Sequence, residues 1–387
     1  MVPQFRFRKF TGDWEQRKVS ELADRYDNLR VPITASERVA GETPYYGANG
    51  IQDYVEGFTH NGEFVLVAED GANDLQNYPV QYVDGKVWVN NHAHVLQAKE
   101  EIVDNKFLMN ALKHTNIEPY LVGGGRAKLN ADVMMKINFK VPTLPEQVQI
   151  GKFFDKLDHL IALHQHKLAK LKELKKGYLQ KLFPRNGEKV PEFRFKGYSD
   201  TWEKRKLGEV ADIRGGGTPS TSKPEYWDGE IDWYAPAEIG TQRYVSGSRR
   251  QITKLGLNKS SATMLPANKT ILFTSRAGIG NAAILTNSGA TNQGFQSIVV
   301  KPATDVYFLY SEIPEIKRKA IRLAAGSTFL EISGKSLTKI QIRLPSFKEQ
   351  SRIGHLFLQI DNLIAATQHK ENLLKKIKQA CLQNMFC

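Results

Sequence analysis

The feature that most constrains the fold is an internal repeat of a long segment with helical character. Residues 136–183 align without gaps on residues 339–386, and 21 of the 48 aligned positions are identical. A second repeat relates residues 3–24 to residues 191–212, with 11 of 22 positions identical at a different offset. The 387 residues exceed what one hydrophobic core usually serves. The sequence therefore predicts two related halves rather than a single domain.

Each long repeat has the pattern of an amphipathic helix that needs a partner. In the first copy, apolar positions recur at intervals of three and four residues from Phe154 to Leu182, as in a heptad seam. His164 and Lys175 occupy seam positions, and we interpret His164 as a packed polar residue that fixes the register. A continuous helix over residues 145–183 would measure about 58 Å. We expect the two copies to pair as antiparallel helices related by a pseudo-two-fold axis.

The segments between the repeats have the character of β-structure. Short runs rich in β-branched and aromatic residues, bounded by turn residues, occur at residues 64–68, 86–89, 94–96, 270–274, 282–285 and 296–300. A helix-like stretch follows in each half, at residues 105–114 and 307–322. We therefore expect an α+β chain in which two β-rich globular units are joined by two long antiparallel coiled-coil helices. Trp14 and Trp202, which match between the halves, are expected to anchor the two cores.

The charge balance favours a polyanionic partner. The formal net charge is +13, but residues 1–145 carry 16 basic and 19 acidic side chains, so the excess lies in the rest of the chain. A basic protein often binds nucleic acid. A soluble protein with a high isoelectric point is the alternative, because a general backbone binder should be basic throughout. No apolar run of 18 residues and no signal-peptide pattern occurs, which predicts a cytoplasmic protein without membrane contact.

Sequence motifs for catalysis and metal binding are missing. No Pro-Pro pair occurs, so the sequence lacks the [Asp/Asn]-Pro-Pro-[Tyr/Phe] motif of adenine methyltransferases. Residues 333–336 resemble the end of a phosphate-binding loop, but Phe329 stands where its first glycine should be. His92 and His94 flank Ala93, and we interpret them as satisfied polar residues or DNA contacts rather than metal ligands. We expect no catalytic residue and no metal site in this chain.

The repeated segments carry a family resemblance. The helical stretch PEQVQIGKFFDKLDHLIALHQHKLAKLKELKKGYLQKLF and its C-terminal copy resemble the conserved regions of DNA-specificity subunits of Type I restriction–modification enzymes. The opening PxFRF…WExRK of each half, and residues 89–96, 274–281 and 292–294, also resemble segments of that family. The resemblance implies target-recognition domains over residues 1–144 and 186–347. It implies spacer helices over residues 145–185 and 348–387.

The resemblance also implies a function and a set of partners. It describes a non-catalytic subunit that reads a split, asymmetric site in double-stranded DNA and docks two modification (methyltransferase) subunits and two restriction (motor–nuclease) subunits. S-adenosylmethionine, ATP and Mg would serve those partners, with no cofactor in this chain. The main alternative is a structural or tethering protein with two adhesive units on a coiled-coil spacer. A single-chain methyltransferase or nuclease is disfavoured by the missing motifs.

Reading a DNA sequence requires side chains that reach base edges, typically Arg to guanine and Asn or Gln to adenine. Arg276 is the strongest candidate, because it follows an apolar run and precedes Gly278 and Gly280, which allow close backbone approach. Each candidate is equally compatible with a phosphate contact or a solvated surface position. The predicted DNA-binding residues are Asn90, Asn91, His92, Arg126, Lys128, Arg249, Arg250, Ser275, Arg276, Gln293 and Lys335.

Overall fold

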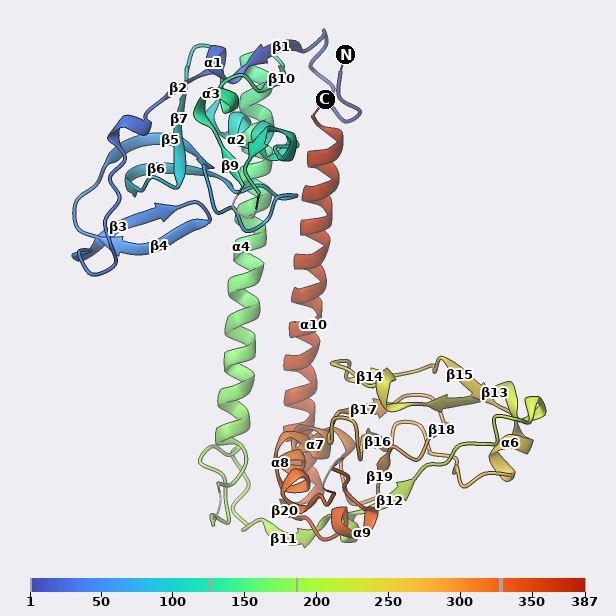
Figure 1. Ribbon diagram of the computed structural model, residues 1–387. Coiled ribbons are helices and arrows are strands. Elements are labelled where there is room, and N and C mark those ends of the chain that lie inside the picture. The colour runs from blue at the N-terminus through green and yellow to red at the C-terminus, as the bar shows by residue number, and fades with distance from the viewer. Residues whose placement is uncertain (1, 125–126, 186, 327–329, 387) are drawn as a thin grey trace. The chain divides into compact units, whose positions relative to one another are not determined.

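The chain forms two compact units that share two long helices. The computed structural model describes residues 2–124, 127–185, 187–326 and 330–386. Unit 1 comprises Met1–His166 and Gln368–Cys387, and unit 2 comprises Lys167–Thr367. The long helices are α4 (Leu144–Lys181) and α10 (Phe347–Asn384), each 38 residues long (Figure 1). Each unit therefore contains one globular part together with a segment of both helices.

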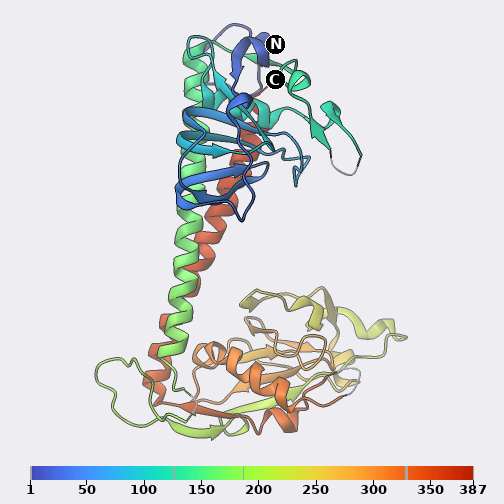
Figure 2. The same ribbon diagram turned by 60° about the vertical axis from the view of Figure 1, so that its left-hand side comes forward.

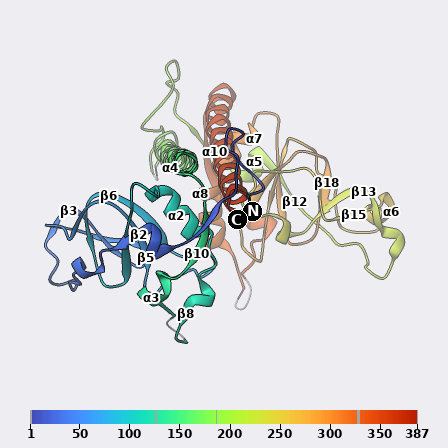
Figure 3. The same cartoon turned by 90° about the horizontal axis from the view of Figure 1, so that it is seen from above.

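Unit 1 is built on a six-stranded sheet with the strand order β2-β7-β5-β6-β3-β4. Its strands pair antiparallel except for β3 and β6, which run parallel. Strands β1 and β10 form a separate antiparallel ribbon, and α2 packs between the sheet and α4 (Figure 3). The elements of the globular part are β1 (Glu15–Lys18), α1 (Val19–Leu22), β2 (Ala23–Arg25), η1 (Asp27–Leu29), β3 (Ala40–Gly47), β4 (Gly50–Val55), β5 (His60–Ala68), β6 (Val80–Val89), β7 (Ala93–Ala98), α2 (Asn105–His114), η2 (Glu118–Tyr120), β8 (Leu121–Val122), β9 (Lys128–Leu129), α3 (Ala131–Met134) and β10 (Asn138–Val141).

Unit 2 repeats part of this plan and changes the rest. Its five-stranded sheet has the order β12-β19-β16-β17-β14, and a three-stranded sheet has the order β15-β13-β18. The helix expected over residues 307–322 is split into α7 and α8 at Glu312, next to Pro314. The elements are β11 (Glu203–Lys206), α5 (Leu207–Val210), β12 (Ala211–Gly215), η3 (Pro224–Tyr226), β13 (Trp227–Tyr234), η4 (Pro236–Glu238), β14 (Tyr244–Val245), β15 (Arg250–Ile252), α6 (Lys254–Asn258), β16 (Thr270–Phe273), β17 (Ala282–Leu285), β18 (Gly289–Thr291), β19 (Gln296–Val300), α7 (Val306–Ser311), α8 (Ile313–Leu323), α9 (Gly334–Leu337) and β20 (Gln341–Leu344).

The two units share one structural frame. The strand order β2-β7-β5-β6 of unit 1 matches β12-β19-β16-β17 of unit 2. The ribbon β1–β10 matches β11–β20 in register, because Glu15 faces Val141 and Glu203 faces Leu344. The expected strands and the presence of two related β-rich units are confirmed.

Each hydrophobic core is completed by a phenylalanine at the end of the helix that arrives from the other unit. In unit 1, the ring of Phe386 lies 6.3 Å from Trp14, 5.6 Å from Phe107 and 6.0 Å from Phe154 between centroids. In unit 2, the ring of Phe183 contacts the matching rings, which belong to Trp202, Phe308 and Phe357, at 5.4 to 5.9 Å. Trp14 and Trp202 are both buried, as the sequence predicts.

The identical residues at the start of the two long helices bind the globular part to the helix. Glu146 is buried and accepts two hydrogen bonds from the Arg6 guanidinium, each 2.7 Å long. Gln147 accepts a hydrogen bond from the backbone N–H of Asp104 and donates to the carbonyl of Pro142. Unit 2 repeats these contacts at the matching positions, which are Arg194, Glu349, Gln350, Asp305 and Pro345.

A glycine lets each long helix approach the N-terminus of the short helix beside it. A Cβ added at Gly151 would lie 2.5 Å from Oδ1 of Asp104, which is the N-cap residue of α2. A Cβ added at Gly354 would lie 2.5 Å from Oδ1 of Asp305, the N-cap residue of α7. Both approaches are tighter than any side chain allows, so the repeated Glu-Gln-x-x-Ile-Gly sequence serves the packing of the helix against its own globular part.

Within each unit, α4 and α10 run antiparallel, and a charged pair crosses between them. In unit 2, Nζ of Lys175 lies 2.7 Å from Oδ1 of Asp361. In unit 1, where α10 again lies beside α4 (Figure 2), Nζ of Lys378 is 2.5 Å from Oδ1 of Asp158. The seam residues of α4 are buried or partly buried, as the heptad pattern predicts. A pairing of an acidic with a basic residue at defined seam layers fixes the register of the two helices.

His164 is partly buried at its seam position, as expected. Its Nδ1 donates a hydrogen bond of 2.8 Å to the carbonyl of Leu160, which lies in the same helix. Its role in fixing the register stays a prediction. The two Lys–Asp pairs are further contacts between the helices, and the sequence analysis did not identify them. Across the described residues, no helix combines the length and the apolar character needed to cross a bilayer.

Lys113 gives a prediction for stability. It lies at the end of α2, and burial, reinforced by Lys378, lowers the pKa of its ammonium to about 8, while Asp158 opposes the shift. We expect Lys113→Met to raise the free energy of unfolding at pH 7 by up to about 3 kcal/mol, because the charged lysine is penalised only in the folded state. Thermal denaturation followed by circular dichroism measures the difference.

The pH dependence of that difference provides the control. The folded-state pKa of Lys113 lies below the unfolded value of 10.5. The wild-type protein therefore gains stability as the pH rises from 8, and the advantage of the variant should shrink toward pH 10. Lys136 is exposed, so Lys136→Met should change neither the free energy of unfolding nor its dependence on pH. An equal gain at all pH values would contradict the explanation.

Candidate nucleic-acid interface

Each unit contains a turn that begins with an asparagine, and the residues after the asparagine differ between the two units. In unit 1, Oδ1 of Asn90 accepts a hydrogen bond of 2.8 Å from the backbone N–H of His92, and its own N–H donates to the carbonyl of Tyr46. In unit 2, Oδ1 of Asn292 accepts a hydrogen bond of 2.8 Å from the backbone N–H of Gly294. The backbone N–H of Asn292 donates to the carbonyl of Tyr234. Each asparagine side chain holds the turn closed. The central residues of the two turns, Asn91 and Gln293, are exposed and occupy equivalent positions.

The ends of the central strands define a second pair of equivalent positions. In unit 1, the backbone N–H of Glu69 donates to His92, and the carbonyl of Glu69 accepts from Leu129. In unit 2, the backbone N–H of Ser275 donates to the carbonyl of Gly294, and the carbonyl of Ser275 accepts from the backbone N–H of Ile332. Glu69 and Ser275 are therefore equivalent. The residues that follow them in the chain are Asp70 and Arg276.

The same hydrogen bonds define a third pair. Leu129 and Ile332 both donate to the strand end, so the residues before them, Lys128 and Glu331, are also equivalent. Both side chains are exposed. Where these strands end, which we call the sheet edge, each unit thus presents three polar groups on a shared backbone frame. The groups are Asp70, Asn91 and Lys128 in unit 1, and Arg276, Gln293 and Glu331 in unit 2.

Two residues of this set were missed by the sequence analysis, for different reasons. Glu331 lies 203 positions after Lys128, so the offset of the long repeat identifies it. Asp70 and Arg276 are 206 positions apart and lie where the two halves have diverged. No local signal in the sequence marks Asp70, and only the backbone hydrogen bonds show that it matches Arg276.

The structure buries two of the predicted DNA-binding residues. Asn90 is 4% exposed, and its side chain is engaged in the turn. Ser275 is fully buried, and its hydroxyl donates a hydrogen bond of 3.2 Å to Oε1 of Glu331. Buried side chains that are already hydrogen-bonded cannot reach a base edge without a rearrangement. We therefore assign these two residues to positioning of their exposed neighbours, in place of the direct contact expected from the sequence.

The other predicted residues are distributed over several places. His92 is partly exposed, and its Nδ1 lies 2.5 Å from Oδ1 of Asp70. Arg249 and Arg250 belong to β15 and the turn before it, and β13 separates β15 from the strand that leads into the Asn292 turn. The Arg250 guanidinium lies 3.6 Å above the ring of Trp227. Lys335 is exposed on α9. Arg126 lies outside the described residues.

Arg276 lies on a loop that is tightly folded around Thr274. The Thr274 hydroxyl donates a hydrogen bond of 2.6 Å to the carbonyl of Gly278 and accepts one from the N–H of Asn281. Ala277 has a φ of +52°, which is unusual for a residue with a side chain. The Arg276 guanidinium is partly exposed, and it has no hydrogen bond or ion pair with any residue that the structure describes. The loop therefore holds an uncommitted guanidinium at the sheet edge.

The positive φ at Ala277 gives a second prediction. A left-handed conformation costs a residue with a Cβ about 1 kcal/mol more than it costs glycine. We expect Ala277→Gly to raise the free energy of unfolding of unit 2 by up to that amount, measured by denaturant titration. The reverse change at Gly278, which has a φ of +104°, should lower it. A destabilising effect of Ala277→Gly would show that loop flexibility outweighs the strain.

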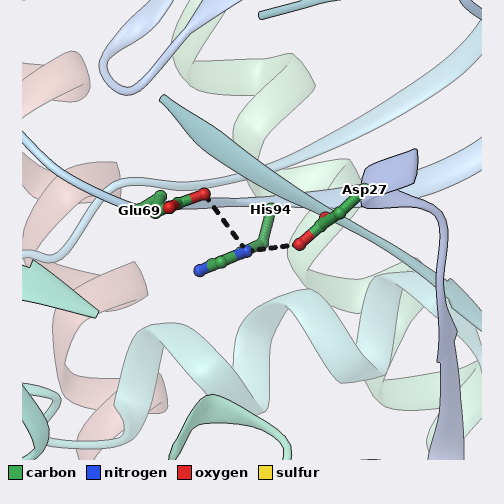
Figure 4. Close-up of side chains that lie close together, drawn as sticks. All are labelled: Asp27, Glu69 and His94. Carbon is green, nitrogen blue, oxygen red and sulfur yellow. Dashed lines mark hydrogen bonds and ion pairs between the residues drawn. The ribbon is translucent and has the colours of Figure 1, made fainter. Parts of the chain in front are cut away.

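A charged cluster lies directly behind the edge of unit 1 (Figure 4). Nδ1 of His94 lies 2.7 Å from Oδ2 of Asp27 and 3.6 Å from Oε2 of Glu69, and its Nε2 lies 2.8 Å from the carbonyl of Leu129. Burial favours a higher pKa for Asp27, but hydrogen bonds from His94 and from the N–H of Val95 outweigh it and hold the pKa below its usual value. Both ring nitrogens of His94 are therefore engaged, one by the Asp27 carboxylate and the other by the carbonyl of Leu129.

This cluster does not fit a metal ion, although its three side chains lie within 4.8 Å of one another. Both ring nitrogens of His94 are engaged in hydrogen bonds. Glu69 already binds the Arg30 guanidinium at 2.6 Å and the Lys128 ammonium at 2.8 Å. A metal would have to displace these two cations and break a hydrogen bond of the His94 ring. The cluster instead holds β9, with Lys128, against the ends of β5 and β7.

The family model and the similar proteins described below all concern type I restriction–modification systems. A family model described as the Type I restriction modification DNA specificity domain matches residues 11–173 and 199–376. A putative type I restriction enzyme specificity subunit of Haemophilus influenzae is 47% identical over 146 residues, which are 38% of this chain and 38% of that protein. A type I restriction enzyme specificity subunit of Methanocaldococcus jannaschii is 34% identical over 189 residues, which are 48% of this chain and 44% of that protein.

These two matches span less than half the length of the relatives concerned. A second Methanocaldococcus jannaschii specificity subunit is 24% identical over 395 residues, covering 95% of this chain and 90% of that protein. Among solved structures, the S subunit of a type I restriction–modification system from M. genitalium resembles the whole chain with a TM-score of 0.70 at 16% identity. The match covers 100% of this chain and 99% of that one, and it shows a shared fold.

Proposed function

Because the chain belongs to the family of type I restriction–modification DNA specificity domains, we propose that it is the DNA-reading subunit of such a complex. It recognises a bipartite and asymmetric site in double-stranded DNA, with one half-site for each unit. One observation carries this proposal. The two units share a backbone frame and present different polar groups at three equivalent positions of one sheet edge.

The chemistry of those groups supports two different half-sites. Arginine recognises guanine through a bidentate contact, asparagine and glutamine recognise adenine, and carboxylates accept from the amino group of cytosine. Unit 2 offers Arg276, Gln293 and Glu331. Unit 1 offers Asn91, with Lys128 held by Glu69. Two readers with the same frame and different side chains suit a site whose halves differ in sequence.

The partners and cofactors complete the proposal. The chain docks two modification subunits, which methylate adenine with S-adenosylmethionine, and two restriction subunits, which use ATP and Mg. It has no catalytic residue or cofactor of its own, and it acts in the cytoplasm. The relatives, which are specificity subunits of type I restriction enzymes, support this assignment.

Mapping of methylated adenines tests the proposal against a tethering function. Cells that express the chain with a modification subunit should acquire methylation at one split motif, located by single-molecule sequencing of genomic DNA. Cells that express the modification subunit alone should not. A tethering protein predicts no new methylated motif and no sequence preference in DNA retention by the purified complex.

Arg276 provides the third prediction. If its guanidinium contacts a base edge, Arg276→Ala should weaken binding by about 1–3 kcal/mol and relax specificity at one base of a single half-site. If it contacts only phosphate, affinity should fall evenly across sequences, and the slope of log affinity against log salt should decrease by about 1. Competition binding with single-base variants of the mapped site distinguishes the two results.

Two further variants act as controls for Arg276. Arg276→Lys keeps the charge but removes the bidentate geometry, so it should restore a phosphate contact and leave a base contact impaired. Lys223→Ala changes an exposed residue of the same unit that is not among the predicted DNA-binding residues. Unchanged binding by Arg276→Ala in both assays would remove Arg276 from the interface.

The fourth prediction concerns the distance between the half-sites. Insertion of one heptad after Leu171 and another after Leu374 preserves the seam and lengthens each helix by about 10 Å. In the sequence, each insertion falls between the residues of the two Lys–Asp pairs, so both pairs can form. The spacer of the methylated motif should grow by about 3 base pairs of 3.4 Å each, with both half-sites unchanged.

An insertion in one helix alone is the matched control for the spacer experiment. It would shift the seam of one helix against the other and disrupt either Lys175–Asp361 or Lys378–Asp158. We expect that variant to lose methylation altogether. A double insertion that methylates the original motif with the original spacer would mean that the helices do not set the distance.

A further inference from the structure

Unit 2 has a groove that the proposed DNA contacts do not use. It lies between α8, the β11–β20 ribbon and the last turn of α4, and its volume is about 1270 Å³. Phe183, Ile340 and Ile342 lie beneath the groove and are almost fully buried, with 2% to 8% of their surface exposed. Leu323, which is 49% exposed, and Pro314, which is also exposed, line it as well. These two side chains give the groove an apolar component that faces solvent.

The rim of this groove is strongly basic. Seven of its lining residues are Lys or Arg, and two are Glu. Arg318 is committed to Glu315 through two hydrogen bonds of 2.8 and 2.6 Å. Lys204, Arg322 and Lys339 are exposed, and none of them has an ion pair or side-chain hydrogen bond with the residues that the structure describes. A set of unpaired cations around an apolar floor attracts a ligand that is both anionic and apolar.

The matching place in unit 1 lacks this character. The equivalent groove is smaller, about 350 Å³, and Phe386 takes the place of Phe183 in its lining. Gln16 stands where unit 2 has Lys204, as the β-ribbon registers show. Lys140 is the only Lys or Arg among the described residues that line it. Within the described parts of the chain, the basic groove therefore distinguishes unit 2 from unit 1, so its ligand should bind one unit and not the other.

We propose that the basic groove of unit 2 is a docking site for an acidic segment of a partner protein, a segment that also carries apolar side chains. The basic rim attracts the acidic residues of the segment, and the exposed apolar lining packs against the apolar residues beside them. A DNA duplex fits less well, because its phosphates reach a basic rim but offer nothing to cover an apolar floor. The proposal is independent of DNA reading, since none of the three equivalent edge positions lines the groove.

Glu312 adds a pH dependence to this site. It is partly buried at the start of α8, and burial, reinforced by Glu315, raises the pKa of its carboxyl to about 7 against the opposing charge of Lys319. The other charged residues that line the groove are Arg185, Lys204, Arg318, Arg322, Lys339 and Arg343. Protonation of Glu312 below pH 7 makes the groove more positive. An acidic ligand should therefore bind more tightly at pH 6 than at pH 8.

A peptide-binding experiment with the full-length chain tests the proposal. The probe is a fluorescein-labelled peptide in which Glu alternates with Leu and Phe, and fluorescence anisotropy measures its affinity. The double variant Arg322→Glu/Lys339→Glu should bind it at least about tenfold more weakly, since each reversal replaces an attraction with a repulsion. Leu323→Ser should weaken it about fivefold through the loss of apolar contact. Glu312→Gln should bind equally well at pH 6 and pH 8.

A matched double variant controls for general electrostatic attraction. Lys223→Glu/Lys254→Glu makes the same change of charge at exposed positions of unit 2 outside the groove, and it should leave peptide affinity nearly unchanged. An all-Glu peptide should bind more weakly than the alternating one. Equal effects of the two double variants, or equal binding of the all-Glu peptide, would overturn the proposal in favour of non-specific attraction.

Two further outcomes would also overturn it. If Arg322→Glu/Lys339→Glu weakens binding of a non-target DNA duplex as much as it weakens peptide binding, the groove belongs to a DNA surface. If the wild-type chain shows no saturable peptide binding at millimolar concentration, the groove is not a docking site for segments of this composition. Neither result bears on the methylated motif, so failure here and failure of the DNA-reading proposal are distinguishable.

Discussion

The fold depends on an aromatic contact made at the far end of each long helix. Phe386 at the end of α10 completes the core of unit 1, and Phe183 at the end of α4 completes the core of unit 2. Loss of a buried phenylalanine from a core typically costs about 3–5 kcal/mol. Backbone hydrogen bonds reinforce each junction, from Phe5 to the carbonyl of Asn384 and from Phe193 to that of Lys181. Each globular part therefore needs a helix that starts in the other half of the chain.

That dependence places strict conditions on the helices, which explains why they are the most similar parts of the two halves. Each helix must begin against its own globular part, through Glu146 or Glu349, and end in the core of the other unit. The Lys175–Asp361 and Lys378–Asp158 pairs then set the register, so that each phenylalanine arrives at the correct layer. A one-residue slip would separate both pairs and withdraw both rings.

The globular parts are free to vary wherever this framework does not restrict them. The strand order of the central sheet and the turn at Asn90 or Asn292 are shared, whereas the side chains at the sheet edge differ in charge. In unit 1, Lys128 is held by Glu69 within a cluster that includes the buried side chain of His94. In unit 2, Arg276 lies on a loop with a positive φ at Ala277 and has no ion pair with the described residues. A buried ionic cluster adds little net stability, so its contribution is a fixed geometry at the edge.

The sequence by itself determined the repeated architecture, the two long helices, the short strands and the core role of Trp14 and Trp202. These features follow from hydrophobic periodicity and internal identity, which are local properties of the chain. The tertiary structure decided which polar residues are accessible. Asn90 and Ser275 look like loop residues in the sequence, yet both are buried, and the hydroxyl of Ser275 bonds to Glu331, 56 residues away. Likewise, only backbone hydrogen bonds between distant segments of each unit show that Asp70 matches Arg276. The ion pair of Lys175 with Asp361 also joins distant parts of the chain, because burial and pairing depend on contacts that no local pattern records.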